Sequence, residues 1–203
     1  MGAREALIEA TKRLLATKGY EATSPRQIQA ASGAGQGSFY HHFAGKADLA
    51  SVALDELSRE MRGDFDRLAT GAALDPVRRY LGAERNPLAG CRIGRIAMEQ
   101  SIEMPELRRP VSAYFRHAHD ELSTAFNQAG VAGDPEALAD LAIAAVQGGY
   151  VLARATGDAG AMHRALAALT ALIDALGTGA AGPATTGADD TTSGDNTTDR
   201  GDG

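Results

Sequence analysis

The segment SGAGQGSFYHHF, from Ser32 to Phe43, holds the residue types whose spacing best suits a chemical site in this chain. Its glycines at positions 33, 35 and 37 could cradle a phosphate, because the backbone N–H groups of a glycine-rich loop bind anions. Its adjacent histidines, His41 and His42, could instead bind a metal ion. A third interpretation is a turn followed by a helix that enters the major groove of DNA.

The first two interpretations lack features that their chemistry requires. A dinucleotide-binding loop follows a strand and completes its fingerprint with a further glycine, whereas here the preceding segment has the pattern of a capped helix and that glycine is missing. Neighbouring residues on a helix diverge, so the adjacent histidines cannot both face one ion. Cys91, His119 and His163 are scattered without the spacing of zinc ligands. The sequence therefore predicts neither a metal nor any other cofactor.

The residues before and within the segment favour the third interpretation. Residues 24–27, SPRQ, have the pattern of a capping box with a first-turn proline, which predicts a short helix to about Ala31. Gly33 then supplies a turn, and Phe39 and Phe43 lie four residues apart on one face of a second short helix. Two short helices joined by a glycine-containing turn form a helix-turn-helix.

The pattern of the remaining chain is helical as well. A helix from Arg4 to Lys18 with Gly19 as its left-handed C-cap precedes the motif, and a long helix from Lys46 to about Thr70 follows it. An aspartate or proline marks the expected helix starts near 75, 105 and 134. Further helices are expected near 93–101, 105–129, 134–156 and 159–176. Trp is absent and β-branched runs are few, so the predicted fold is all-α.

Charge is distributed unevenly along the chain. The net charge of -6 argues against a nucleic-acid partner, because phosphate binding needs a basic surface. Residues 1–49, however, hold six Lys or Arg and four Asp or Glu, a balance of +2, while the remainder holds 14 basic and 22 acidic residues, a balance of -8. Only the N-terminal segment suits DNA.

The single cysteine and the hydropathy pattern indicate the compartment of the protein. Cys91 cannot form an internal disulfide and is expected to pack as a small apolar residue. The N-terminus has no continuous hydrophobic segment typical of a signal peptide. No stretch approaches the ~18 uninterrupted apolar residues that a bilayer requires. We expect a soluble, cytoplasmic protein with no membrane partner.

Two stretches resemble a known family. Residues 18–49 resemble the N-terminal domain of TetR-family transcriptional regulators. Their sequence is KGYEATSPRQIQAASGAGQGSFYHHFAGKADL, and the family's motif in this region is G-x-x-x-G-[ST]-[LF]-Y-x-[HY]-F-x-x-K. NPLAGCRIGRIAMEQSIEMPELRRPV, from Asn86 to Val111, resembles the C-terminal domain of the LmrA/YxaF-type subgroup. The resemblance implies a helix-turn-helix domain at 1–46 and a helical ligand-binding and dimerisation domain at 47–177. An acidic Gly/Thr/Asp-rich tail at 178–203, with few large apolar residues, is expected to be disordered.

The resemblance also implies which residues contact double-stranded DNA. The residues expected to face the major groove are Gln36, Gly37, Ser38 and Tyr40. Those expected near phosphates are Thr23, Ser24, Arg26, His41, His42 and Lys46. Gly35 replaces the usual Ser or Thr cap of the second helix, which should weaken its start by a few tenths of a kcal/mol. Gln36 replaces a frequent Lys, and Gln29 stands where a small Ala commonly permits close packing.

A homodimer is expected, because one short reading helix contacts too few bases to be selective and a pair reads two half-sites. One apolar stripe on the 134–156 helix comprises Leu138, Leu141, Ala142, Ala145, Gly149 and Leu152. A second, on the last helix, comprises Met162, Leu166, Leu169, Ile173 and Leu176. Two such helices from each subunit could form a four-helix interface. The alternative is that one stripe packs into its own subunit's core.

The family resemblance favours a ligand pocket in the body, lined by Phe115, His119, Gln147 and Tyr150. It implies a repressor that a small apolar or aromatic effector releases from a palindromic operator. A buried core with satisfied polar residues would show the same pattern. No Ser/His/Asp arrangement suggests an enzyme, yet a helical enzyme or binding protein with purely structural N-terminal helices stays open as an alternative. So does a DNA-binding activator or architectural protein.

Overall fold

The structure of the chain is a computed structural model that describes residues 2–179. The described residues form nine α-helices and one 3-10 helix, without strands, which confirms the predicted fold class. The helices are α1 (Ala3–Lys18), α2 (Pro25–Ser32), α3 (Gln36–His42), α4 (Lys46–Leu68), α5 (Asp75–Gly82), α6 (Gly94–Ala97), the 3-10 helix η1 (Gln100–Glu103), α7 (Pro105–Ala129), α8 (Pro135–Thr156) and α9 (Ala159–Gly179). The predicted tail, apart from its first two residues, lies outside the described residues.

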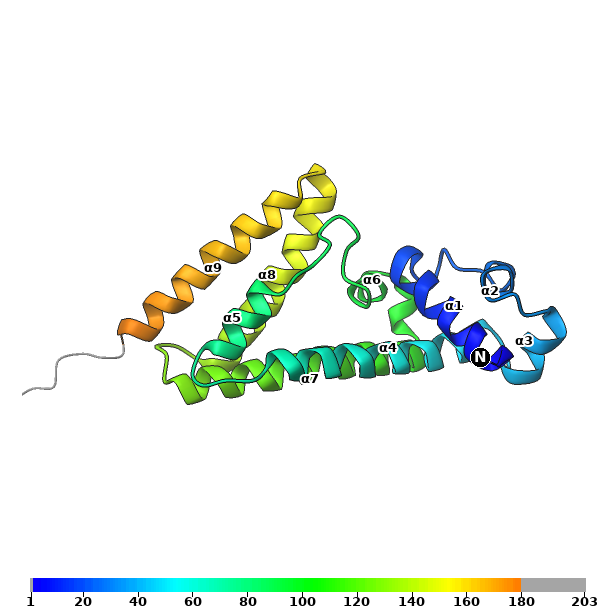
Figure 1. The fold of residues 1–203 in the computed structure, drawn as a ribbon, viewed down its shortest axis with the longest axis horizontal. Helices are drawn as coiled ribbons and strands as arrows, with labels where there is room; N and C mark the ends of the chain where they lie inside the picture. The colour runs from blue at the N-terminus through cyan, green and yellow to red at the C-terminus, as the bar shows by residue number, and fades with distance from the viewer. Residues whose placement is uncertain (1, 180–203) are drawn as a thin grey trace, which may run out of the picture.

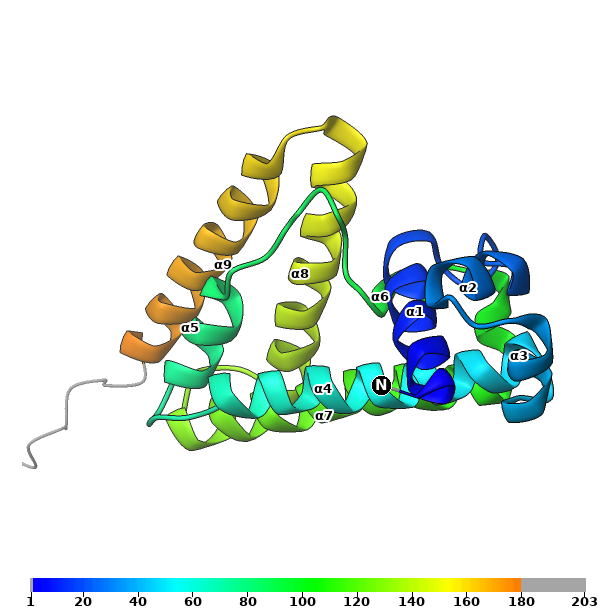
Figure 2. The ribbon, with the colours of Figure 1, turned by 45° about the vertical axis from the view of Figure 1, so that its right-hand side comes forward.

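The long helices α4 and α7 lie side by side along the molecule, with α1–α3 at one end and α5, α8 and α9 at the other (Figures 1 and 2). One hydrophobic core joins α1–α4 to α6 and the first half of α7. The largest fully buried side chains of this end include Leu7, Ile8, Leu15, Ile28, Phe39, Leu49 and Leu54. Because α4 belongs to this core and continues into the body, it connects the two ends mechanically.

A second core fills the body, where α8 and α9 pack against each other and against α5 and α7. Gly149 allows the close approach of α8 to α9, since a Cβ atom there would lie only 2.7 Å from Cγ of Met162. Within α7, Pro110 has no N–H to donate to the carbonyl of Glu106. That carbonyl instead accepts a hydrogen bond of 3.1 Å from the hydroxyl of Ser51, which ties α7 to α4.

Most predicted helix ends are confirmed. Ser24 and Gln27 form the predicted capping box. Gly33 ends α2 in the left-handed conformation, with φ 71° and ψ 5°. Asp134 caps α8 by accepting from the N–H of Glu136 at 3.0 Å. The prediction that Asp75 caps a helix is wrong, because Asp75 is already the first residue of α5.

Two further predictions are corrected around α6. Gly19 ends α1 with φ 86° but an extended ψ of 177°, so it is not a left-handed cap. The single helix predicted near 93–101 divides into α6 and η1, because Glu99 between them is extended, with φ -97° and ψ 151°. This break lets the Glu99 side chain reach the turn that begins at Gly19.

Candidate nucleic-acid interface and ligand cavities

The exposed face of α3 forms the candidate DNA-reading surface. Phe39 is fully buried and Phe43 nearly so, which confirms the predicted anchors of this helix. Gln36 and Gly37 are exposed, and Tyr40 leaves 56% of its surface accessible, with its ring packed edge-on against Phe39 at 5.0 Å. An aromatic residue held outward in this way is available to base edges or to the sugar-phosphate backbone. Ser38 lies beside these residues but is half-buried.

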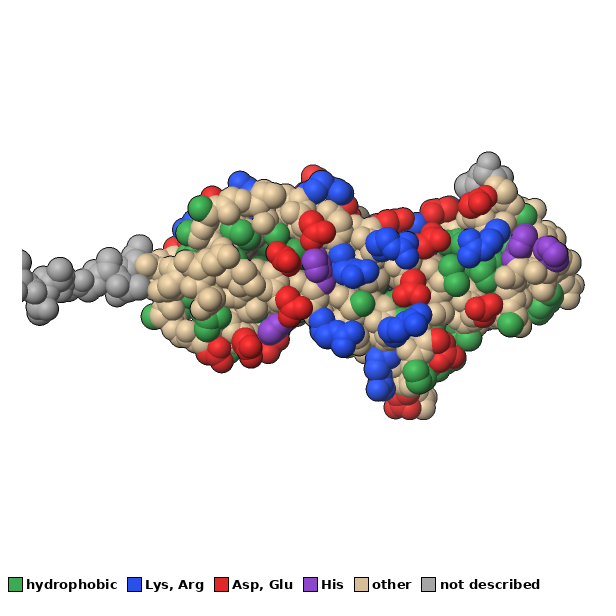
Figure 3. Space-filling view, turned by 90° about the horizontal axis from the view of Figure 1, so that it is seen from below, with side chains coloured by type: hydrophobic (Ala, Val, Ile, Leu, Met, Phe, Trp, Pro, Cys, Tyr) green, Lys and Arg blue, Asp and Glu red, His purple; other side chains and the backbone are tan. Residues whose placement is uncertain are grey.

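Four of the six residues predicted near phosphates are exposed around α3. Ser24 and Arg26 lie at the start of α2, and His41 and His42 lie at the end of α3. The hydroxyl of Ser24 already caps the N–H of Gln27 at 3.3 Å, so only part of its hydrogen-bonding capacity is free. Histidine side chains gather at this end of the molecule in Figure 3.

The other two residues have partners inside the protein. Thr23 is only 2% exposed, and its hydroxyl donates to the carbonyl of Gly19 at 2.6 Å, so its side chain is withdrawn from DNA. Lys46 donates to the carbonyls of Tyr20 and Thr23 at 3.1 and 3.0 Å. Its Nζ lies 3.8 Å from the centre of the Tyr20 ring, and burial lowers the pKa of Lys46. Both residues hold the turn before α2 in place, a role that the motif alone did not reveal.

Glu99 links the end of the molecule that holds α1–α3 to the segment that follows α5. Its Oε2 accepts from the N–H groups of Tyr20 and Glu21 at 2.9 and 3.2 Å, and from the hydroxyl of Ser101 at 3.1 Å. In return, Oε1 of Glu21 accepts from the N–H of Ser101 at 3.0 Å. We call this set of contacts the Glu99 link. No local sequence pattern identifies it, because its partners lie about 80 residues apart.

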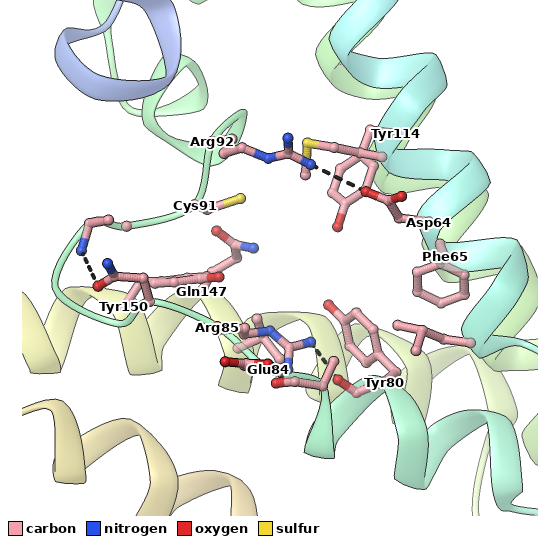
Figure 4. Close-up of a pocket in the computed structure, with 17 residues that line it drawn as sticks. Asp64, Phe65, Tyr80, Glu84, Arg85, Cys91, Arg92, Tyr114, Gln147 and Tyr150 are labelled. Atoms are coloured by element: carbon pink, nitrogen blue, oxygen red, sulfur yellow. Dashed lines mark hydrogen bonds and ion pairs between the residues drawn. The ribbon is translucent and has the colours of Figure 1, made fainter. Parts of the chain in front are cut away.

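A cavity of about 410 Å³, the body cavity, lies between α4, α5, α7, α8 and the loop before α6 (Figure 4). The phenol groups of Tyr80 and Tyr114, the thiol of Cys91 and the amide of Gln147 point into it. Burial raises the pKa values of Tyr80, Tyr114 and Tyr150 above their ordinary value, so these phenols stay neutral. Neutral phenols are hydrogen-bond donors set among apolar walls, which suits a small aromatic or carbonyl-bearing molecule.

Charged side chains border the body cavity without filling it. Arg85 donates to the carbonyls of Tyr80, Leu81 and Ala83, and its guanidinium lies 5.1 Å from the centre of the Tyr80 ring. Arg92 forms an ion pair of 3.4 Å with Asp64 of α4, which joins the loop before α6 to that helix. A molecule entering here would meet both the loop and α4.

The predicted ligand-binding residues are distributed over two cavities. Gln147 and Tyr150 line the body cavity, and together with Phe115 they line a neighbouring cavity, described below. His119 lines neither, because it faces Asp120 and Asp140, with nitrogen–oxygen distances of 3.6 and 3.7 Å. The sequence did not identify Tyr80 or Tyr114 as lining residues, since buried tyrosines in a helical pattern look like core. Among residues 2–177, no group of three or more His, Cys, Asp or Glu is placed to hold a metal ion.

The two apolar stripes predicted for dimerisation need correction. The last-helix stripe packs inside its own subunit, because Met162, Leu166, Leu169 and Ile173 are buried in the body core. Ala142 and Gly149 on α8 are buried too. Leu141 and Leu152 of the first predicted stripe and Leu176 of the second are exposed. They belong to an exposed face that also comprises Ala144, Gly148, Val151 and Ala155 on α8 and Ala168 and Leu172 on α9.

We call this set the exposed α8–α9 face. By length and composition alone, α8 and α9 could each cross a membrane, and only 28% and 22% of their most apolar windows are buried. Charged residues interrupt both helices, among them Asp140, Arg154, Arg164 and Asp174, so they are not convincing spans.

Elsewhere on the molecule, basic side chains are interspersed with acidic ones over the middle of the face seen in Figure 3. Arg109 and Asp55, for example, pair at 3.0 Å.

Comparison with known proteins agrees with this arrangement. Residues 7–53 match the description "Bacterial regulatory proteins, tetR family", and residues 71–168 match "Transcriptional regulator LmrA/YxaF-like, C-terminal domain". A TetR transcriptional regulator from Chloroflexus aurantiacus is 30% identical, with a TM-score of 0.75 over 85% of this chain and 94% of that one. No curated protein matches the chain.

Two other solved structures show the same fold at lower identity. The reduced form of Escherichia coli NemR is 20% identical, with a TM-score of 0.76 over 85% of this chain and 97% of that one. A TetR-family regulator from Agrobacterium tumefaciens is 23% identical, with a TM-score of 0.75 over 84% and 97%. The two matched domains, the shared fold and the exposed helix-turn-helix together show that this chain belongs to the TetR family of DNA-binding transcriptional regulators.

Proposed function

We propose that the chain is a homodimeric repressor that binds a palindromic operator in cytoplasmic double-stranded DNA and is released by a small apolar or aromatic effector. The observation that carries this proposal is the α3 surface, where buried Phe39 holds Gln36 and Tyr40 outward at the tip of the molecule. In the proposed division, residues 1–46 read DNA and residues 47–177 sense the effector and dimerise. TetR regulators bind DNA and are typically dimers, and they are generally not enzymes.

The exposed α8–α9 face supports dimerisation. Leu172 is 64% exposed, and Val151 and Leu152 are each about half exposed. Large apolar side chains gathered on one helical face mark an interaction surface. The alanines and glycine between them permit close helix approach, so the same face of a second subunit could complete a four-helix interface. Each dimer would then present two α3 helices to successive major grooves.

The connection between the body cavity and α3 supports effector control. Helix α4 starts at Lys46, directly after the DNA-reading helices, and about four to five turns further along it contributes Met61, Asp64 and Phe65 to the cavity wall. A ligand that displaces this wall would swing α4 and change the spacing of the two α3 helices. Only a ligand with different affinities for the two arrangements can shift their populations.

The salt dependence of DNA binding tests the proposal. DNA selected from a random-sequence pool should contain two related half-sites. Its affinity should fall steeply as salt rises, because Lys, Arg and phosphate contacts release counterions. Footprinting without paired half-sites would support an architectural protein instead. Absence of any salt-dependent DNA binding would favour a helical binding protein whose N-terminal helices are structural.

A further inference from the structure

A second cavity, of about 680 Å³, lies where the end of α1 meets α6, α7 and α8. We call it the junction cavity. Cys91, Gln147 and Tyr150 form the wall that it shares with the body cavity. Much of the remaining surface is apolar and is contributed by Ala97, Met98, Phe115, Val151 and Ala155. A cavity of this size and lining accommodates a small organic molecule.

The charged groups of the junction cavity are unbalanced. Lys18, Arg95 and Arg154 face a single acidic residue, Glu99. One oxygen of the Glu99 carboxylate, Oε2, already accepts three hydrogen bonds in the Glu99 link. Among residues 2–177, no carboxylate lies within ion-pair distance of any of the three cations. In a chain with a net charge of -6, this local excess of positive charge is unusual.

The environment of Arg95 shows that this excess of positive charge is not confined to fully solvated side chains. Its Nε is buried and has no hydrogen-bond partner, while its Nη2 donates to the carbonyl of Ala89 at 3.1 Å. Burial and the neighbouring Arg154 lower the pKa of Arg95, and the opposing effect of Glu99 is smaller. Lys18 and Arg154 lie in the last turns of α1 and α8, where the helix dipole favours cations. That effect explains their positions but not the position of Arg95.

We propose that the junction cavity binds an amphipathic organic acid, with its carboxylate paired to Arg95 and Arg154 and its apolar part against Met98, Phe115 and Val151. A guanidinium presents paired donors that match a carboxylate, and an anion placed here relieves the repulsion between the two arginines. The apolar walls select a molecule with a hydrophobic chain or ring over a small inorganic anion. This inference concerns ligand binding alone and does not depend on the proposed repressor function.

The position of the cavity sets how the test is made. Val151 and Ala155 also belong to the exposed α8–α9 face, so the junction cavity opens beside the proposed subunit interface. The experiment therefore uses the full chain in its native oligomeric state. Isothermal titration calorimetry with decanoate below its micelle concentration measures binding directly. Decanol offers the same chain without the charge, acetate offers the charge without the chain, and naphthoate offers an aromatic acid.

Saturable binding of decanoate or naphthoate is expected, with decanol and acetate at least about tenfold weaker. Arg154→Gln should lower the acid's affinity by about tenfold, since it removes a charge-assisted hydrogen bond. Arg95→Gln should act similarly, and thermal melting checks that this partly buried position still folds. Arg59→Gln, an exposed arginine on α4 outside the cavity, is the matched control and should bind the acid like the wild type.

Three results would overturn the inference. The first is no saturable binding of either acid. The second is equal affinity for decanoate and decanol. The third is an Arg154→Gln variant that binds the acid as well as the wild type does; if that variant also loses DNA affinity at fixed salt without added ligand, the arginine is assigned to the phosphate backbone.

Discussion

At the scale of single residues, Tyr40 distinguishes a DNA-reading helix from a merely structural one. Its ring is exposed while its neighbour Phe39 is buried, so Tyr40→Ala should leave the fold intact. We expect the affinity for selected DNA to fall by about tenfold, the usual effect of losing one good base or backbone contact. Fluorescence anisotropy at fixed salt measures the change. Unchanged affinity, with an unchanged melting curve, would contradict the assignment of this face.

The glycines around the turn provide a matched pair of substitutions. Gly35 caps α3 with an extended backbone, φ -69° and ψ 163°, and open space surrounds a Cβ atom there. Gly35→Ser should therefore stabilise the chain by a few tenths of a kcal/mol, because the hydroxyl can cap α3. Gly33→Ser should destabilise it by about 1 kcal/mol, because φ at Gly33 is +71°. Denaturant unfolding compares the two variants, and the same sign for both would refute the argument.

Sequence patterns reveal single residues when their partners are local. Phe39 and Phe43 were identified as anchors because their spacing of four places them on one helical face. Thr23 and Lys46 match the family motif equally well, yet both bind carbonyl groups of the turn before α2. That turn's path depends on Glu99, which is remote in the sequence. A motif can therefore name a residue without showing whether it faces DNA or the protein.

At the scale of elements, the break between α6 and η1 matters because it frees Glu99 for the turn after α1. Glu99→Ala would leave the N–H groups of Tyr20 and Glu21 without their acceptor. We expect a loss of about 1–3 kcal/mol in the free energy of unfolding. Hydrogen exchange at these two amides should accelerate more than exchange in α9. Glu103→Ala, at an exposed position of η1, is the control.

Gly19 offers a second measure of the Glu99 link. A Cβ atom at this position would lie 1.6 Å from Oε1 of Glu99, and the φ angle of +86° already disfavours any side chain. As a single substitution, Gly19→Ala should therefore destabilise the chain through both the clash with Glu99 and the unfavourable φ angle. In the Glu99→Ala background the clash is absent, so only the cost of the φ angle should remain. Additive effects of the two substitutions would argue against contact between these positions.

Helix boundaries were more predictable than helix orientation. Proline and aspartate marked the starts of α7 and α8 correctly, because these signals act within one turn. The inward faces of α8 and α9 were harder to predict, since alanine and leucine occur on every face of both helices. The buried stripe through Met162 and Ile173 and the exposed stripe through Leu172 look alike in sequence. Only the positions of α5 and α7 decide between them.

At the scale of the whole molecule, α4 makes the two ends interdependent. It packs against α1 in one core, along α7 for much of its length, and against α5 in the body. The Glu99 link adds a second connection through α6 and η1. A change at the body cavity can thus reach α3 both along α4 and through the loop that carries Cys91 and Arg92.

The proposed subunit interface on the exposed α8–α9 face would decide whether those displacements matter, because two reading helices have a register only if two subunits associate. Leu172→Glu places a charge where the side chain is 64% exposed, so the subunit's own core is undisturbed. In a four-helix interface the same charge would be buried, which costs several kcal/mol and should yield monomers. Analytical ultracentrifugation measures the subunit mass, and anisotropy measures DNA affinity.

Leu88→Glu is the matched control, since Leu88 is similarly exposed but lies in the loop before α6. We expect it to stay dimeric and to bind selected DNA as the wild type does. Leu172→Glu should lose most of its affinity for a two-half-site duplex while retaining the weak affinity of one helix-turn-helix for a single half-site, because the avidity of paired binding disappears. A dimeric Leu172→Glu variant with full affinity would show that another surface joins the subunits.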